Sequence, residues 1–599
     1  MLVWGKKRNF VVRMKRNRFI ILFCLLTVGL ASTAANDGDH NYSVTRNMEI
    51  FSSIYKHLDM MYVDTLDADV TVGAGIRAML RSLDPYTEYY PAEDVKDLKT
   101  LLTGKYAGIG ALIKHDLHND CVIIDEPYEG MPAAEAGLRK GDVIVAVDDT
   151  LMKGKSVSDV SAMLRGEPGT SFVLKIQRPS PLDGKSKTMK IKVTRRSIQL
   201  PCVPYYGIIG SDGIAAHKEG TGGTAGDNAA HKEGTGGSDG KVGYLLLTQF
   251  TDDCARDVRR ALVDLRSQGM KSLIFDLRDN GGGSLNEAVK IVNMFIKKGE
   301  TIVSTRGKLK RSFNEYKTTS EPLDTVMPIV VLVNRNTASA SEITAGSLQD
   351  LDRAVILGTR TYGKGLVQVP VDLPHDASLK VTISKYYIPS GRCIQAINYK
   401  HTGGGYKENI PDSLTHEFKT RGGRTVRDGG GIKPDVEIKG DSLASITAAL
   451  FSSGMDSTEV AMQYVVSYVA KHPAIAKPAE FRLTDADYEE FKEMAISSGF
   501  KYDLGTGKMF DELVKVARTE GRYNEAQAEF DALKAKLSQD LRADLDRHRE
   551  AIQSFLEEEI VTCYYYQRGA AECMLKYDKQ VARAMELLKD KEQYDKLLR

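Results

Sequence analysis

A serine and a lysine stand twenty-five positions apart, Ser339 and Lys364, within TASASEITAGSLQDLDRAVILGTRTYGKGLVQ. Ser339 lies where the apolar run Met327–Val333, predicted as a buried strand, gives way to helical spacing over Ser339–Leu351. Free backbone N–H groups and the helix dipole at such a junction favour developing negative charge. Ser339 is therefore a candidate nucleophile with an oxyanion site beside it. Taken alone, helix N-cap is the commoner role for such a serine.

Lys364 is the nearest candidate base. A free lysine, with a pKa of about 10.4, is protonated at neutral pH, so it can accept the serine proton only where burial lowers its pKa. Gly363 and Gly365 would let the backbone bring it close, and Gln368 could orient the amine by a hydrogen bond. Taken alone, a lysine in such a turn is more often a solvated residue.

The segment GTRTYGK, at Gly358–Lys364, also fits the phosphate-binding pattern G-x-x-x-x-G-K. The next residue is Gly365 instead of the Ser or Thr whose hydroxyl holds magnesium. The sequence that follows, LVQVPVDLP, favours a strand or loop where a phosphate loop needs a helix. A nucleotide hydrolase is therefore disfavoured.

Several motifs in order, TASASEI, LQD, GTRTYGKG and LVQ, resemble the core of the C-terminal processing peptidases. These are serine proteases with a Ser/Lys dyad and a crotonase-like core. The resemblance implies that Ser339 is the nucleophile, Lys364 the general base and Gln368 its orienter, with no cofactor or metal. It favours a structural role for Asp350, in LQD.

The turn DNGGG, at Asp279–Gly283, lies between a predicted strand and a predicted helix. The resemblance implies that this turn supplies one oxyanion donor and that the amide after the serine, Ala340, supplies the other. Gly282 is the preferred donor of the turn, with Gly281 as the alternative. Such donors stabilise a tetrahedral intermediate by roughly 3 kcal/mol each.

Residues 104–198 form a β-rich unit whose segments YAGIGALI, PAAEAGL and GDVIVAVD resemble a PDZ domain. A glycine-rich turn ahead of a strand can hold a terminal carboxylate, and the neighbouring sheet edge can pair with the ligand as an added strand. Here the turn is Gly108, Ile109 and Gly110. Arg165 is a candidate for gating or for contact with the protease core, with solvated surface as the commoner role.

Residues 1–35 have the layout of a secretory signal. A basic stretch without acids precedes the apolar run Phe19–Leu30, and small residues follow to Ala35. An uncleaved membrane anchor through residues 19–35 is the alternative. Either way we expect an exported body, in the periplasm or cell envelope of a Gram-negative bacterium.

Composition excludes several classes of function. The chain has 599 residues, with 42% hydrophobic and 27% charged ones, as in globular proteins. Without its leader it is mildly acidic, which gives no indication of nucleic-acid binding. Seven scattered cysteines without C-x-x-C indicate neither a metal site nor a disulfide framework. H-E-x-x-H is absent, and G-x-S-x-G does not surround Ser339, which disfavours a metalloprotease and a Ser/His/Asp hydrolase.

We expect a multidomain α/β and α+β protein: a crotonase-like ββα protease core with an inserted PDZ domain, an N-terminal helical segment and a C-terminal helical domain. Between the PDZ unit and the core, AAHKEGTGG occurs twice, from Ala215 and from Ala229, and its composition predicts a flexible insertion. The charged helical tail resembles those of processing peptidases of the Bacteroidetes kind. The expected boundaries are 1–35 signal peptide, 36–103 helical segment, 104–198 PDZ domain, 199–241 connection with the insertion, 242–441 protease core and 442–599 helical domain.

The sequence thus predicts an exported serine endopeptidase that binds protein C-termini in its PDZ domain and cleaves through an acyl-enzyme. Its expected partners are protein or peptide substrates with free C-termini. The family resemblance implies that the N-terminal helices can support a homodimer, and a packed helical cap explains them equally well. The alternative function is a catalytically weak PDZ scaffold or adaptor with a protease-like core.

Overall fold

The computed structural model describes residues 39–599 apart from gaps at 96–97, 99, 101–102, 117–119, 181–184, 211–214, 217–239, 397–410, 441–442, 452–457, 504 and 538–539. The predicted leader and nearly all of the repeated insertion lie outside the described residues. The chain divides into two compact units, Met1–Ser82 and Leu83–Arg599, which are described separately.

The first unit consists of two helices. One runs over residues 39–61, and the other is α2 (Ala68–Arg81). Asp67 caps α2 by accepting the backbone N–H of Val70 at 3.0 Å. A row of apolar side chains on the first helix is exposed, among them Ile50 and Ile54.

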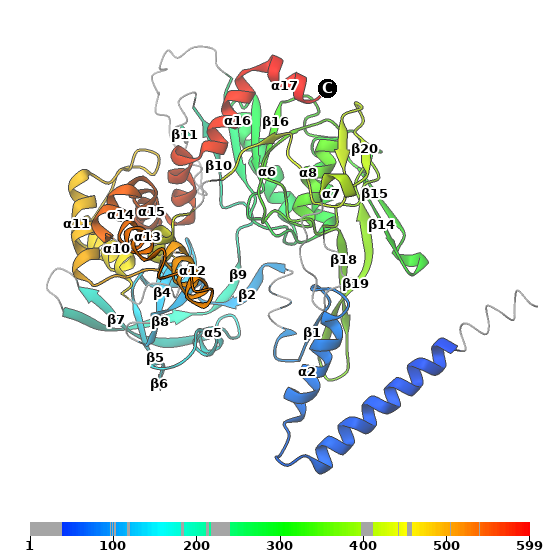
Figure 1. Cartoon of the computed structure of the whole chain (residues 1–599). Helices are drawn as coiled ribbons and strands as arrows, with labels where there is room; N and C mark the ends of the chain where they lie inside the picture. The colour runs from blue at the N-terminus through cyan, green and yellow to red at the C-terminus, as the bar shows by residue number, and fades with distance from the viewer. Residues whose placement is uncertain are drawn as a thin grey trace, which may run out of the picture. The chain divides into compact units, whose positions relative to one another are not determined.

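The largest sheet of the second unit has seven strands in the order β11-β10-β12-β13-β16-β17-β22, and the strands from β12 to β22 are parallel. Its strands β10, β11 and β16 are labelled in Figure 1. The bounds are β10 (Tyr205–Ile209), β11 (Ala215–Ala216), β12 (Val242–Leu246), β13 (Ser272–Asp276), β16 (Ile329–Val333), β17 (Val355–Gly358) and β22 (Val436–Glu437). Such strands read as continuous apolar runs because both faces of a parallel sheet are covered.

Helices cover both faces of this sheet. On one face, α6 (Cys254–Ser267), α7 (Leu285–Val292) and α8 (Ala340–Asp350) share a buried cluster with alternate strand residues such as Leu273 and Val331. On the other face, α16 (Lys579–Lys589) and α17 (Lys591–Leu597) pack on Ile274, Val330 and Leu332. α16 and α17 thus complete the buried core on this face of the sheet.

A second sheet has the order β1-β19-β14-β15, with β18 also paired to β19. The bounds are β1 (Glu88–Tyr90), β14 (Thr301–Gly307), β15 (Asn314–Lys317), β18 (Leu366–Asp372) and β19 (Ser378–Tyr387). The segment 36–103, expected to be helical, therefore contributes a strand as well, since Pro85 and the aromatic residues after it favour extended backbone. The loop between β17 and β18 carries Lys364.

The β-rich unit contains a six-stranded sheet, β3-β4-β5-β7-β8 with β6 on β5, and a separate pair of β2 and β9. Its bounds are β2 (Lys105–Gly108), β3 (Ala111–Asp116), β4 (Cys121–Pro127), α4 (Pro132–Glu135), β5 (Val143–Val147), β6 (Thr150–Leu151), α5 (Val157–Leu164), β7 (Ser171–Ser180), β8 (Lys185–Thr194) and β9 (Arg196–Gln199). Among the described strands β3 lies at the edge of this sheet, close to α5.

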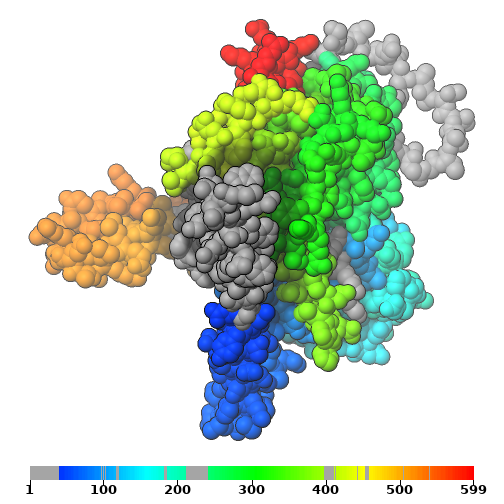
Figure 2. Space-filling model, turned by 90° about the vertical axis from the view of Figure 1, so that its right-hand side faces the viewer, coloured from blue at the N-terminus to red at the C-terminus, as the bar shows by residue number. Residues whose placement is uncertain are grey.

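The C-terminal region is helical, and its main core joins α9, α10, α11, α14 and α15. The bounds are α9 (Ser445–Phe451), α10 (Val460–Lys471), α11 (Asp485–Ser497), α12 (Gly505–Thr519), α13 (Gln527–Lys536), α14 (Leu541–Arg547) and α15 (Arg549–Met574). α12 and α13 bury few side chains, and their orange segment projects in Figure 2. In the part of the chain that is described, no helix combines the length and apolarity that crossing a membrane requires.

The mixed α and β content predicted from the sequence is confirmed. An ion pair ties the C-terminal helices to the sheet: Arg278, just after β13, contacts Asp276 and also Asp578, which caps α16, at 2.6 Å.

Candidate active site

Ser339 lies at the start of α8 with φ 58° and ψ −117°, an uncommon conformation for a residue with a side chain. Surrounding hydrogen bonds hold this backbone. The amide of Ala338 donates to the carbonyl of Asn280 at 3.0 Å, and the Thr337 hydroxyl donates to the carbonyl of Leu277 at 2.9 Å. Strain of this kind, about 1–3 kcal/mol, persists only where neighbours fix it, and it is frequent at functional sites.

The carboxylate of Glu342 joins the serine to the lysine loop. Its Oε2 accepts hydrogen bonds from the backbone amides of Ser339, at 2.9 Å, and Lys364, at 2.8 Å. Its Oε1 accepts the amide of Gly363 at 2.7 Å and the hydroxyl of Thr361 at 2.5 Å. Burial raises the pKa of Glu342, and these hydrogen bonds oppose the rise. One fully buried side chain therefore fixes both segments.

Tyr386, buried on β19, provides a second link. Its hydroxyl lies 2.6 Å from the carbonyl oxygen of Lys364, to which it donates, and 3.3 Å from the carbonyl oxygen of Ser339. Glu342 and Tyr386 therefore each contact the backbone of both Ser339 and Lys364.

The amine of Lys364 lies 4.6 Å from the centre of the Tyr86 ring, in the Leu83–Tyr90 segment. Burial and, to a smaller extent, the positive charge of Lys380 lower the pKa of Lys364, and the acidic groups Glu342, Glu88 and Asp84 oppose this; the resulting pKa is about 8. Lys380 itself pairs with Glu88. Partial burial of this side chain thus gives Lys364 the lowered pKa that a lysine base requires.

Gln368 lies on β18, where its side-chain nitrogen donates to the Thr382 hydroxyl of β19 at 3.1 Å. The side chain is therefore engaged with the neighbouring strand. Its role as orienter of Lys364 stays a prediction.

The Gly281–Gly282 turn lies directly against the serine. Gly282 has φ +98°, and a Cβ on it would lie 2.7 Å from the Ser339 Cβ and 2.8 Å from the Ala340 nitrogen. The two predicted oxyanion residues, Gly282 and Ala340, are therefore neighbours. The amide of Gly282 donates to Asn280 Oδ1 at 2.9 Å, so Gly281 stays an alternative donor.

Asp350, at the end of α8, contacts the buried Arg392 at 2.8 Å and accepts the amide of Ser390 at 3.0 Å. These contacts hold the turn after β19 and involve neither Ser339 nor Lys364. The structural interpretation of Asp350 agrees with them.

The predicted carboxylate-binding turn follows β2. Gly110 has φ +69°, a conformation that glycine adopts without strain. The carbonyls of Ile109 and Gly110 accept the amides of Ala133 at 2.8 Å and Tyr128 at 2.9 Å. Gly108 ends β2, so the three residues form a fixed turn that leads into the edge strand β3.

Sequence reasoning missed Glu342, Tyr386 and the contact of Tyr86 with Lys364. Glu342 stands three residues after Ser339, the spacing of a capping box, which could have identified it. Nothing in local periodicity marks the other two, because their contacts join distant segments. In the described residues no three His, Cys, Asp or Glu side chains come together as a metal site would require.

A serine at a helix start, a glycine turn against it and a half-buried lysine on a loop that shares the Glu342 carboxylate are the parts that a serine-peptidase type of site requires. Comparison with known proteins then gives the family. Residues 241–402 match Peptidase family S41, residues 123–178 match the PDZ domain, and residues 447–588 match the C-terminal helical domain of probable PDZ-proteases.

Individual proteins similar to this chain indicate the same family. The chain is 32% identical over 382 residues to the carboxy-terminal-processing protease of Bartonella bacilliformis, covering 63% of this chain and 79% of that protein. It is 32% identical over 358 residues to a probable CtpA-like serine protease of Staphylococcus aureus, covering 59% and 64%. The chain belongs to the carboxy-terminal-processing proteases of family S41, and the family predicted from the motifs is confirmed.

Solved structures also resemble the chain. The photosystem II D1 C-terminal processing protease is 28% identical, covering 65% of this chain and 86% of that one, with a TM-score of 0.34. The PDZ domain of a carboxy-terminal protease from Vibrio cholerae, solved in complex with peptide, is 25% identical, covering 16% and 99%, with a TM-score of 0.15.

Proposed function

We propose that this protein is an exported endopeptidase that hydrolyses peptide bonds through Ser339 and Lys364. The observation that carries the proposal is the shared clamp: one oxygen of Glu342 accepts hydrogen bonds from the backbone amides of Ser339 and Lys364, and the Lys364 side chain is withdrawn from solvent enough to lower its pKa. The pKa of Lys364, lowered to about 8, leaves an appreciable neutral fraction near neutral pH. A neutral amine can act as a general base.

In the proposed reaction the Lys364 amine accepts the hydroxyl proton of Ser339 while Oγ bonds to the substrate carbonyl carbon. The oxyanion then accepts the amides of Ala340 and of the Gly281–Gly282 turn. Collapse breaks the C–N bond, and the Lys364 ammonium protonates the leaving amine. Water, deprotonated by Lys364, hydrolyses the acyl-enzyme and regenerates the serine. Gln368 would orient the amine once its side chain leaves Thr382.

We further propose that the PDZ domain selects substrates by their free C-terminus. The Gly108–Gly110 turn would hold the carboxylate, and the edge strand β3 would pair with the substrate backbone. The core around Ser339 is proposed to be crotonase-like, as the motif resemblance implies.

Two contacts favour the alternative, a catalytically weak PDZ scaffold. The Gly282 amide is bound to Asn280, and the side chain of Gln368 is bound to Thr382. If the protein is an active enzyme, these two contacts belong to its resting state, and substrate binding would have to break them.

Export rests on the sequence. The basic, apolar and small-residue segments of residues 1–35 support secretion to the periplasm or cell envelope of a Gram-negative bacterium. If the leader is retained, residues 19–35 would hold the protein at the membrane.

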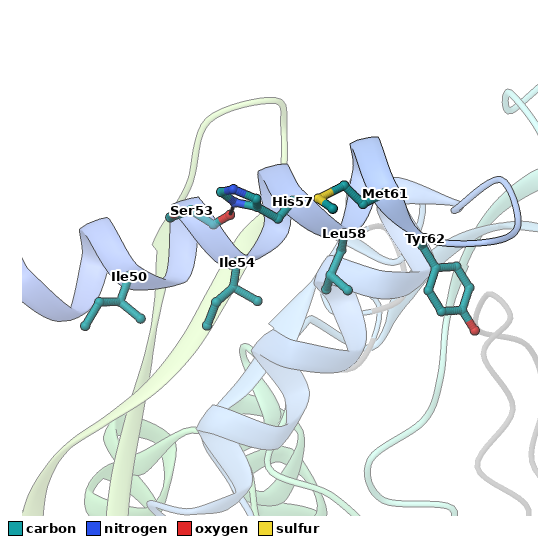
Figure 3. Close-up of a pocket in the computed structure, with 7 residues that line it drawn as sticks. All are labelled: Ile50, Ser53, Ile54, His57, Leu58, Met61 and Tyr62. Carbon is teal, nitrogen blue, oxygen red and sulfur yellow. Dashed lines mark hydrogen bonds between the residues drawn. The ribbon is translucent and has the colours of Figure 1, made fainter.

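A homodimer through the helix of residues 39–61 is also proposed. Ile50, Ile54 and Leu58 extend from the same side of this helix (Figure 3), with 49%, 55% and 39% of their surface exposed. An i, i+4 apolar row can pack against its own copy about a two-fold axis.

Light scattering should give a dimer mass for the native chain and a monomer mass for Ile54→Glu. A dimer mass in both would exclude this helix as the contact.

The deciding experiment is cleavage of an unfolded protein substrate by residues 36–599, comparing wild type, Ser339→Ala and Lys364→Ala. We expect no turnover in either variant, no effect of EDTA, and slower cleavage of a C-terminally amidated substrate. Wild-type rates in Ser339→Ala would exclude the assigned nucleophile. An inert wild type would favour the scaffold.

A further inference from the structure

The segment Leu83–Tyr90 brings an aromatic ring to the lysine amine. The Nζ atom of Lys364 lies 4.6 Å from the centre of the Tyr86 ring, which is within the range of a cation–π contact. Both side chains are half-buried, so the contact is partly withdrawn from water. The ring therefore forms one wall of the place where the amine lies.

Asp84 fixes the backbone that carries this ring. One oxygen of its buried carboxylate accepts hydrogen bonds from the backbone amides of Tyr86, at 2.8 Å, and Thr87, at 2.7 Å. The other oxygen accepts the Thr87 hydroxyl at 2.9 Å. Pro85 lies inside this turn, and its own ring restricts the backbone further. The direction of the Tyr86 side chain is therefore set by a tightly bonded turn ahead of β1.

Thr87 joins this turn to the residue that holds Gln368. Its hydroxyl oxygen accepts the backbone N–H of Thr382, on β19, at 3.2 Å. The Thr382 hydroxyl in turn accepts the side-chain nitrogen of Gln368 at 3.1 Å. One turn of the chain therefore contacts the amine of the proposed base directly and reaches its proposed orienter through a single residue.

The charged groups around the amine are already engaged with other partners. Three acidic groups and one cation act on Lys364, namely Glu342, Glu88, Asp84 and Lys380. Glu88 pairs with Lys380, Asp84 holds the turn, and Glu342 accepts the donors of the serine and lysine segments. When the amine takes the serine proton, the ring face is therefore placed to stabilise the ammonium that forms.

We propose that Tyr86 is a positioning residue of the Ser/Lys pair: its ring holds the Lys364 amine in place and stabilises the ammonium formed when the amine takes the proton of Ser339. Asp84 and Thr87 hold the ring. The proton passes from the serine Oγ to the lysine Nζ and then to the leaving amine, so the ring acts while Nζ is charged. This inference rests on the proposed mechanism and adds to it a residue from a distant segment.

The test compares variants of the full chain in cleavage of an unfolded protein substrate over a range of pH. Tyr86→Phe keeps the ring face, and Tyr86→Leu keeps apolar bulk without a ring. The matched control is Tyr387→Leu. Tyr387 is also half-buried, and the guanidinium carbon of Arg306 lies 4.7 Å from the centre of its ring. Strand alternation directs its side chain away from the face that Tyr386 occupies.

We expect Tyr86→Leu to lower kcat about tenfold with little change in KM. It should also move the pH profile of kcat/KM to lower pH by about half a unit, because the ammonium loses a partner that the neutral amine does not need. Tyr86→Phe and Tyr387→Leu should keep the native rate and profile.

A profile that stays in place or moves to higher pH in Tyr86→Leu would overturn the inference, and so would an equal loss of kcat in Tyr86→Phe or in Tyr387→Leu. These outcomes leave the proposed mechanism intact as long as Lys364→Ala is inactive. If Lys364→Ala kept the native rate, the proposed mechanism would fail and this inference with it.

A second readout does not depend on activity. Lysine labelled with ¹³C at Cε gives a signal for Lys364 in the Ser339→Ala chain, assigned by its loss when Lys364→Ala is added. The protons on this carbon should resonate upfield of those of solvated lysines, because they lie beside the face of the Tyr86 ring. Tyr86→Leu should remove this displacement, and Tyr387→Leu should keep it. A signal at the position of solvated lysines in the chain with Tyr86 intact would show that the ring does not hold the amine.

Discussion

Ser339 and Lys364 donate their backbone amides to the same atom, Oε2 of Glu342, at 2.9 and 2.8 Å. The two residues proposed for catalysis are therefore positioned by a third whose own side chain is fully buried. A shift of this carboxylate would displace both at once, which makes the pair sensitive to changes that leave the serine and the lysine in place.

Glu342→Gln tests this arrangement. An amide nitrogen cannot accept a hydrogen bond, so at least one of the four donors around Glu342 loses its partner. We expect kcat to fall about tenfold or more. The control is Glu287→Gln: Glu287 is a buried carboxylate of α7 that accepts the Ala255 amide at 2.9 Å, away from the serine. This control should lower the melting temperature with little change in kcat. Equal kcat losses in the two variants would contradict the clamp.

Gly282→Ala should inactivate the protein, whereas Gly281→Ala should not. A Cβ on Gly282 would lie 2.6 Å from the Ala338 carbonyl oxygen, but nothing lies within 4 Å of a Cβ on Gly281. Both substitutions keep the backbone N–H, so a difference in activity between the two variants reports a displacement of the turn and not the loss of a donor. We expect a loss of about a hundredfold in kcat/KM for Gly282→Ala, as for other displacements of catalytic groups. Comparable activity of the two variants would argue against an oxyanion site here.

Tyr386→Phe removes the hydroxyl that donates to the Lys364 carbonyl and should lower kcat about fivefold. Tyr205→Phe is the counterpart: the Tyr205 hydroxyl is buried and has no hydrogen-bond partner among the described residues. Its removal should leave kcat unchanged and keep or raise the free energy of unfolding, by up to about 1 kcal/mol. Denaturant unfolding and initial rates on the same preparations give both quantities. A lower stability of Tyr205→Phe would indicate an unseen partner.

The dependence of activity on pH should follow Lys364. The amine must be neutral to act as a base, so kcat/KM should rise with pH through about 8, the lowered pKa of Lys364. Lys380→Gln removes a positive charge that lowers this pKa, so its profile should shift to higher pH. Lys385→Gln, an exposed residue of the same strand, should leave the profile in place. A profile that does not move in Lys380→Gln would exclude Lys364 as the titrating group.

Local pattern was enough to place the serine. The predicted strand Met327–Val333 and helix Ser339–Leu351 correspond to β16 (Ile329–Val333) and α8 (Ala340–Asp350), because a continuous apolar run and helical spacing each reflect burial on a regular element. The family followed from the short motifs, since they preserve order and spacing around Ser339.

Long-range pairing could not be predicted in this way. The aromatic ring against the Lys364 amine is that of Tyr86. β1 pairs with β19, which places Glu88 opposite Lys380, almost three hundred residues further along the chain. No periodicity encodes such a partner. The C-terminal helices carried no predicted chemistry, yet α16 lies on the sheet that positions the serine.

That packing bears on how such proteins can be recombined. Because α16 and α17 cover Val330 and Leu332, and Asp578 holds Arg278 beside the strand that leads to the glycine turn, a chimera joining this core to another tail would uncover an apolar sheet face. The catalytic region and its last helices must therefore be inherited together. The PDZ domain builds its own buried core, but Lys140 pairs with Glu559 of α15 at 2.7 Å, so a replacement PDZ domain would have to keep this contact with the helical domain.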